Sequence, residues 1–311
     1  MKPLERVAKP LKARAWRLAS RLRGAREFWR DMRRYQQLSA PTGSDALGAL
    51  RGRNLESQVT RDYHRIEKGL ALRDPRRPFG VAVRNRLELL LQNEGSESEY
   101  GKNAESALQA LEEWNERGQI DASVSPKYVT LPASSISQDE LTRFFKSRKS
   151  IRTYISTPVP EDQVRQAVEL AQHTPSVCNR QPWRVHVYHG EYAQKVLGLH
   201  NGSAAFAKNV PSVAVITVDA PLFGGSGERN QRWIDGGLFA MSFVWALHGL
   251  GISTCMLNWS RSNDDSDRLR VTAGIPESED VITLLAFGFA NPEARVARSP
   301  IRPTTAVFVS H

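Results

Sequence analysis

The alternation of helical and strand-length apolar segments after residue 136 constrains the fold of this chain more than any other feature. Apolar residues three and four positions apart predict helices that begin near Ser137 and Pro160, and a long helix over 229–249. Short apolar runs predict strands at 184–189, 213–218, 281–289 and 305–310. Because helices and strands interleave, residues 137–311 are expected to form an α/β or α+β domain.

The first part of the 311-residue chain has a different organisation. Residues 1–36 are basic, and residues 55–118 carry apolar residues at helical spacing. Residues 37–54 and 119–136 are polar and rich in turn-forming residues, so we interpret them as linkers. The sequence therefore predicts a basic tail, a helical region and an α+β domain, joined by two linkers.

The positive charge is concentrated at the N-terminus. Residues 1–35 contain twelve Lys and Arg and three acidic residues, a net charge of +9, whereas residues 36–311 hold 31 basic and 30 acidic residues. The overall charge of +10 thus belongs to the tail. Because the rest of the chain is close to neutral, we expect no nucleic-acid partner.

Apolar residues within this tail predict an amphipathic helix. They recur at alternating spacings of four and three residues, which places them on one helical face, namely Leu11, Ala15, Leu18, Leu22, Ala25, Trp29 and Met32. Such a face is typical of a helix that contacts anionic lipid or a partner protein. A helix that packs on its own protein or on a second subunit has the same pattern, so both interpretations remain open.

Cysteine content and hydropathy predict a soluble protein of a reducing compartment. Cys178 and Cys255 are the only cysteines, too few for a disulfide scaffold or a four-cysteine zinc site. No apolar stretch is long enough to span a bilayer, and the N-terminus lacks the apolar core of a secretory signal. We expect a cytoplasmic location, with membrane-surface contact through residues 1–35 as an alternative. No metal site is predicted, because His186 and His189 would point to opposite faces of a strand.

A first cluster that could do chemistry is Arg148-Lys149-Ser150-Ile151-Arg152, directly after a predicted helix. If the segment is extended, Arg148, Ser150 and Arg152 share one face, because side chains alternate along a strand. Two guanidinium groups with a hydroxyl between them suit a phosphate, which arginine can bind bidentately. A solvated basic turn is the simpler interpretation of these residues taken alone.

A second cluster lies in the loop from Thr174 to Trp183, between a predicted helix and a predicted strand. Prolines at 175 and 182 stiffen this loop. Ser176, Asn179 and Gln181 offer neutral donors and acceptors, which suit a planar heterocycle with amide edges. A single loop asparagine is usually a turn former, and Trp183 is expected in the core.

The two clusters and the sequence around them resemble the nitroreductase family of FMN flavoproteins. The order and spacing of the Arg148–Arg152 string, Thr157-Pro-Val-Pro160 and the Pro175–Trp183 string match the N-terminal signature of that family. Asp235-Gly-Gly in the long helix and Leu284-Leu-Ala-Phe-Gly-Phe-Ala agree with later parts of the family. The resemblance covers residues 137–311.

The resemblance implies an α+β fold, a three-layer sandwich with a central antiparallel sheet that forms an intertwined homodimer. FMN would lie at the subunit interface and be reduced by NADH or NADPH. Arg148, Ser150 and Arg152 would hold the FMN phosphate, the ribityl chain and the N1/O2 edge of the ring.

The resemblance assigns further positions around the flavin. Pro175, Ser176 and Asn179 would line the ring, and Met256 and Leu257 would lie in the turn that passes near N5. Many relatives carry a proline and an acidic residue in that turn, where this chain has Met256-Leu257-Asn258. Arg302 would complete the phosphate clamp, with Arg298 as a second basic residue beside it.

We therefore predict an FMN-dependent oxidoreductase that takes a hydride from NAD(P)H and reduces a small organic acceptor. No side-chain acid or base is required, because the cofactor carries the chemistry. Two alternatives use the same pocket or tail. One is a flavin-binding interaction or sensor protein docked through its basic N-terminal helix, and the other is an FMN dehydrogenase of a different substrate class.

Overall fold

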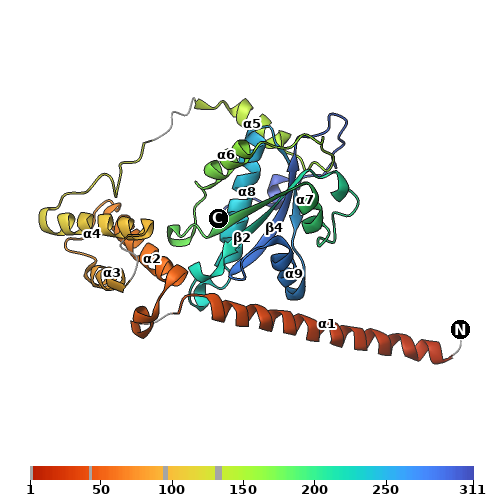
Figure 1. Ribbon diagram of the computed structural model, residues 1–311, viewed down its shortest axis with the longest axis horizontal. Coiled ribbons are helices and arrows are strands. Elements are labelled where there is room, and N and C mark those ends of the chain that lie inside the picture. Colours follow the sequence, from red (N-terminus) through yellow and green to blue (C-terminus); the bar gives the residue numbers. More distant parts are fainter. Residues whose placement is uncertain (1–2, 42–43, 94–96, 130–134) are drawn as a thin grey trace.

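A computed structural model of the protein describes residues 3–41, 44–93, 97–129 and 135–311 (Figure 1). Its centre is a four-stranded sheet in the order β1-β2-β4-β3. The strands are β1 (Trp183–His189), β2 (Ser212–Asp219), β3 (Ser253–Asn258) and β4 (Glu279–Gly288). Every neighbouring pair is antiparallel, which confirms the predicted type of sheet.

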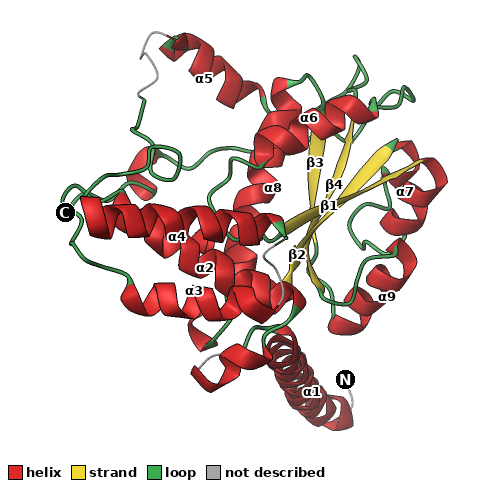
Figure 2. Ribbon diagram, turned by 60° about the vertical axis from the view of Figure 1, so that its left-hand side comes forward, coloured by secondary structure: helices red, strands yellow, loops and turns green. Residues whose placement is uncertain are grey.

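Helices cover both faces of this sheet, so the domain has three layers (Figure 2). Helices α6 (Glu161–Ala171) and α8 (Gln231–Gly249) share a core with one face, and α7 (Gly190–Leu197) and α9 (Asn263–Ala273) share a core with the other. Strand β2 is buried along its whole length, because alternate side chains enter alternate cores. The predicted α+β three-layer sandwich is confirmed, and Trp183 lies in its core, stacked on Phe239 at 4.8 Å between ring centroids.

The helical N-terminal region has a core of its own. Helices α2 (Gly52–Leu70), α3 (Val81–Asn93) and α4 (Glu99–Arg117) bury a shared set of Leu, Val, Ile and Ala side chains, beside a short 3₁₀ helix at Ser44–Ala49. Three polar contacts between described residues join α2 to the sheet domain, including one from Arg180 to Ser57 at 3.2 Å. Ser57 donates a hydrogen bond to the Leu222 carbonyl at 2.7 Å, and Arg53 pairs with Asp219 at 2.6 Å.

Helix α1 (Pro3–Leu38) is a long rod whose C-terminal part contacts the sheet domain near α9, while its N-terminal part extends past the body (Figure 1). Its last turn is anchored by Tyr35, which is buried against Val218 and Phe223. The predicted apolar face does not pack on its own chain, because its large side chains from residue 18 to residue 32 are exposed, namely Leu18, Leu22, Trp29 and Met32. The side chains of Leu11 and Ala15 lie outside the described part of the structure. Among the described helices, none is long and apolar enough to cross a membrane.

One predicted strand is wrong, and one strand of the sheet was not predicted. Residues 305–310 do not form a strand, because Thr304–Ala306 is a 3₁₀ helix and the amides of Ala306, Val307 and Phe308 donate to carbonyls of the same segment. Conversely, β3 was not predicted, since the predicted long helix ends at residue 249 and Met256 and Leu257 were expected in a turn. The helix predicted to begin near Ser137 is α5 (Gln138–Ser147), which Ser137 and Glu140 open with a capping box. The short helices α7 and α9 were not predicted.

Candidate functional site

The basic segment after α5 is extended and runs beside the edge strand β3. Ser150 forms a parallel bridge with Thr254, and the Ile151 amide donates to the Thr254 carbonyl at 2.9 Å. Ile151 packs against the core beneath it. Because side chains alternate along an extended chain, Ser150 and Arg152 are directed away from that core, on the side shared with Arg148.

The guanidinium groups of Arg148 and Arg152 create a positive site at this edge. Within the described chain, neither forms an ion pair or a hydrogen bond. Their charge is felt nearby: burial raises the pKa of the Cys255 thiol, and Arg152 and Arg148 act against that rise. The two guanidinium groups have no carboxylate partner among the described residues, and the Ser150 hydroxyl lies between them in sequence. Together these three groups form a donor set that fits a phosphate.

Met256 and Leu257 lie in strand β3 and not in a turn, which corrects the expectation for these two residues. Met256 pairs with Leu285 and Leu257 with Leu284 of β4. Because side chains alternate along a strand, Met256 lies on the same face as Thr254, the residue that pairs with the basic segment, and it is exposed. The Leu257 side chain lies on the opposite face and is buried in the core. Of these two residues, Met256 therefore presents its side chain to solvent at this edge.

The loop between α6 and β1 has an unusual backbone. Cys178, Asn179 and Gln181 all have positive φ angles, of 50°, 53° and 45°. For residues other than glycine this left-handed conformation costs roughly 1–2 kcal/mol each. Strained residues persist where the surrounding structure holds them, and they gather at functional sites. The loop chosen from its composition is therefore also the most strained segment of the described sheet domain.

Several contacts hold this loop in place. Asp235 of α8 accepts a hydrogen bond from the Val177 amide at 3.1 Å, and the Ser176 hydroxyl accepts one from the Gln181 amide at 2.9 Å. The Asn179 side chain is exposed at the tip, where its Oδ1 lies 3.3 Å from the Gln181 amide nitrogen Nε2. Ser176 thus has a structural task besides its predicted position near a ring.

Arg180 anchors the loop from beneath. Its side chain is 0% exposed and donates to the Leu222 carbonyl at 2.6 Å, to Glu228 at 2.7 Å and to Ser57 of α2 at 3.2 Å. Burial alone would raise the pKa of Glu228, but the hydrogen bonds and charge of Arg180 hold it below the ordinary value. Burial raises the pKa of Asp235.

The residues that anchor the loop were missed by the sequence analysis. Arg180 and Asp235 were quoted within motifs without a role, Ser57 lies in the predicted helical region 55–118, and Glu228 lies in a segment interpreted as a loop. The charges of Arg180, Asp235 and Glu228 beside apolar sequence are a signal that they need partners, but the pattern does not say which partner each will meet, and Ser57 carries no such signal.

One chain does not bring all the predicted site residues together. The strained loop binds Asp235, in the second turn of α8, whereas the basic segment adjoins β3, which follows the other end of α8. At 1.5 Å per residue, the helix separates these two places by roughly 20 Å. Arg302 and Arg298 lie in an exposed C-terminal segment, and Arg302 has no polar contact among the described residues.

Comparison with known proteins identifies the family. A sequence profile described as the nitroreductase family matches residues 145–200, which include the basic segment and the strained loop. Nitroreductase NfnB of Mycolicibacterium smegmatis is 38% identical over 234 residues, covering 58% of this chain and 97% of that protein. The chain belongs to the nitroreductase family.

Other relatives are more distant. An NADH dehydrogenase of Thermus thermophilus is 28% identical, over 47% of this chain and 84% of that protein. A 4-nitrobenzoate reductase of Pseudomonas putida is 21% identical, over 51% and 88%. Among solved structures, a nitroreductase family protein of Streptococcus pneumoniae TIGR4 matches with a TM-score of 0.48 and 17% identity, covering 55% of this chain and 100% of that one.

Proposed function

We propose that the protein is an FMN-dependent oxidoreductase that takes a hydride from NADH or NADPH and reduces a small organic acceptor. Membership of the nitroreductase family supports this proposal, and so does the name of the Thermus thermophilus relative, an NADH dehydrogenase. The observation that carries it is the extended basic segment, where Arg148 and Arg152 flank Ser150 and have no carboxylate partner among the described residues.

The residues of the site fit FMN in charge and in hydrogen-bonding capacity. Arg148 and Ser150 would hold the phosphate and ribityl oxygens, and Arg152 would face the N1/O2 edge of the ring. Bound FMN supplies hydride transfer between a reduced nicotinamide and an acceptor. Arg152 contributes a fixed positive charge where reduction places negative charge, and Met256 adds an exposed apolar side chain at the same edge.

The strained loop would face the flavin through Pro175, Ser176 and Asn179. The separation of this loop and the basic segment along α8 supports a site in which the two segments come from different chains. We therefore propose that the site is completed by a second copy of the chain, as a homodimer with FMN at the interface. The exposed C-terminal segment would bring Arg302 to the phosphate in that assembly.

The visible spectrum tests this function directly. We expect the purified protein to be yellow, and to bleach under anaerobic conditions on addition of NADH or NADPH. A colourless protein that does not take up added FMN would contradict flavin binding. A yellow protein that bleaches with dithionite but with neither nucleotide would contradict the oxidoreductase activity and favour a flavin-binding sensor.

A further inference from the structure

Helix α1 has two faces of opposite character, and its polar face makes the contacts with the body. Glu27, Arg30, Asp31 and Arg34 recur at three- and four-residue spacing and all face α9 and the start of β4. Arg30 pairs with Asp264 and with Asp267 at 2.9 Å, and Arg34 pairs with Asp280 at 2.7 Å. Glu27 accepts a hydrogen bond from the Asn263 amide at 2.8 Å, and Asp31 accepts one from the Asn263 side chain.

The opposite face of α1 is apolar and exposed. We call Leu18, Leu22, Trp29 and Met32 the apolar stripe. Their exposures are 60%, 63%, 52% and 51%, so each is more than half accessible. The stripe lies roughly half a turn around the helix from the residues that contact the body. Docking of the polar face therefore fixes the stripe in an outward orientation.

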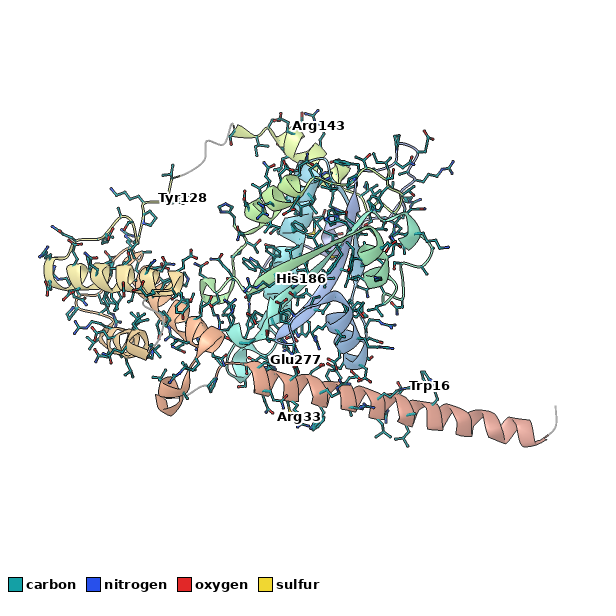
Figure 3. The ribbon with its side chains drawn as sticks, viewed as in Figure 1. Trp16, Arg33, Tyr128, Arg143, His186 and Glu277 are labelled. Atoms are coloured by element: carbon teal, nitrogen blue, oxygen red, sulfur yellow. The ribbon has the colours of Figure 1, made fainter. Side chains whose placement is uncertain are left out.

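The margins of the stripe are positively charged. The Arg33 guanidinium lies 5.2 Å from the centre of the Trp29 ring, on the side of α1 turned away from the body (Figure 3). Arg21 and Arg33 have no carboxylate partner within the described chain. Two acidic residues, Glu27 and Asp31, lie among the side chains of α1 that the structure describes, and both are on the body side against Asn263. The outward face thus combines apolar side chains with uncompensated positive charge.

We propose that the apolar stripe of α1 docks on the surface of an anionic lipid bilayer. The apolar side chains enter the interfacial region while Arg21 and Arg33 bind lipid phosphates, as arginines do beside an apolar face. A second copy of the helix is a poorer occupant, because it would bring a second set of unpaired arginines against the first. Docking in this way leaves the body of the protein on the aqueous side of the helix.

Co-sedimentation of the full chain with lipid vesicles tests the proposal. We expect binding to vesicles made of equal parts phosphatidylcholine and phosphatidylglycerol, little binding to phosphatidylcholine alone, and weaker binding as the salt concentration rises. Equal binding to both vesicle types, or to neither, would overturn the proposal. Bleaching by NADH is measured on the same sample, so that failure of the proposed function is distinguished from failure of lipid docking.

A matched pair of variants separates the stripe from general electrostatic attraction. Trp29→Glu places a negative charge in the stripe, whereas Trp16→Glu makes the same change at an exposed tryptophan roughly 140° away around the helix. We expect Trp29→Glu to weaken binding by about tenfold or more. We expect Trp16→Glu to bind nearly as well as the parent protein.

Equal losses in the two variants would overturn a role for the stripe. Sedimentation velocity without lipid tests whether a second copy of the chain covers the stripe. If the parent protein forms an assembly that Trp29→Glu dissociates and Trp16→Glu does not, a second copy covers the stripe and the lipid proposal is wrong. Both tryptophans are exposed, so neither substitution disturbs a buried contact of the fold.

Discussion

Arginine has two contrasting roles in this protein at the scale of single residues. Arg180 is fully buried, and its charge is matched inside the chain by Glu228 and by carbonyl oxygens. Arg148 and Arg152 face outward beside β3, and no carboxylate of the described chain pairs with either. The first arrangement fixes a strained loop, while the second leaves charge available for an anion from outside the chain.

The proposed role of Arg152 predicts a loss of flavin affinity when its charge is removed. Arg152→Ala should weaken FMN binding by about tenfold or more, since a charge-assisted hydrogen bond contributes ~1.5–3 kcal/mol. It should also lower the midpoint potential of the flavin, because the charge beside N1/O2 favours the reduced form. Fluorescence titration of the FMN-free protein measures the affinity. Lys149→Ala, on the alternate side of the segment, is the control, and equal affinity in both variants would refute the role.

Glu228 predicts a specific dependence of stability on pH. Its pKa in the folded protein is below the ordinary value of 4.5, because Arg180 outweighs the effect of burial. A lowered pKa gives stabilisation that is present above pH 4.5 and is lost as the pH falls below it toward the folded value.

Glu228→Gln should therefore be less stable than the parent protein at neutral pH, and the difference should shrink in acid. Urea unfolding at a series of pH values measures it. Glu277→Gln, at an exposed glutamate, serves as the control. A difference that stays constant below pH 4.5 would show that the Glu228 charge is not what matters.

At the scale of elements, α1 shows how far sequence reasoning reaches. Its period and its charge predicted a long amphipathic helix, and the structure confirms the helix. The pattern could not say which face meets the body, because that depends on Asp264, Asp267 and Asp280, which are distant in sequence. The polar face docks and the apolar face does not, the reverse of an ordinary surface helix.

The strands also show that a sequence pattern does not determine which segments will meet in the fold. The buried strands β2 and β4 were predicted, since a continuous apolar segment of strand length is typical of a strand covered on both faces. Residues 305–310 have a similar pattern but form hydrogen bonds within their own segment, and β3 has a weaker pattern but an edge of β4 beside it. The basic segment and the strained loop could be chosen from their residues. The separation of these two segments by α8 could not be predicted from the residues, because it follows from the order of strands in the sheet.

The last turn of α1 should contribute to the stability of the whole sheet domain. Tyr35 is buried and donates a hydrogen bond to the Gly225 carbonyl at 2.7 Å. The Arg232 guanidinium lies over the Tyr35 ring, 5.1 Å from the ring centre. Tyr35→Ala should lower the free energy of unfolding by about 3 kcal/mol, as loss of a buried aromatic ring does. Urea denaturation measures this change. Tyr192→Ala, at an exposed ring, should have little effect, and similar values for both would contradict the anchoring role.

At the scale of the whole molecule, the exposed surface supports the proposed homodimer. Helix α8 lies in the core layer, yet Trp233, Ile234 and Leu238 on its outer side are each about half exposed. The C-terminal segment adds exposed apolar side chains at Ile301 and at 307–309. Exposed apolar groups of this size on a long helix and on a C-terminal segment are typical of a surface covered by another subunit.

Assembly and flavin binding should therefore be lost together. Ile234→Glu should shift the protein toward the monomer and weaken FMN binding in the same preparation, because each site needs the strained loop of the other copy. Sedimentation velocity and FMN titration measure the two effects. Val271→Glu, at an exposed apolar residue of α9, is the matched control. A monomeric variant that keeps its affinity for FMN would contradict a shared site.

The contact of Ser57 and the Leu222 carbonyl with Arg180 has a practical consequence. A fragment that starts at residue 137 retains every residue assigned to the flavin, yet it lacks the helix that closes over the buried guanidinium. Water would then reach the underside of the loop bearing Asn179, whose left-handed backbone depends on that support. Trimming the protein to the part it shares with its relatives should give a polypeptide with a loosened cofactor loop, so its catalytic parameters would misrepresent those of the intact molecule.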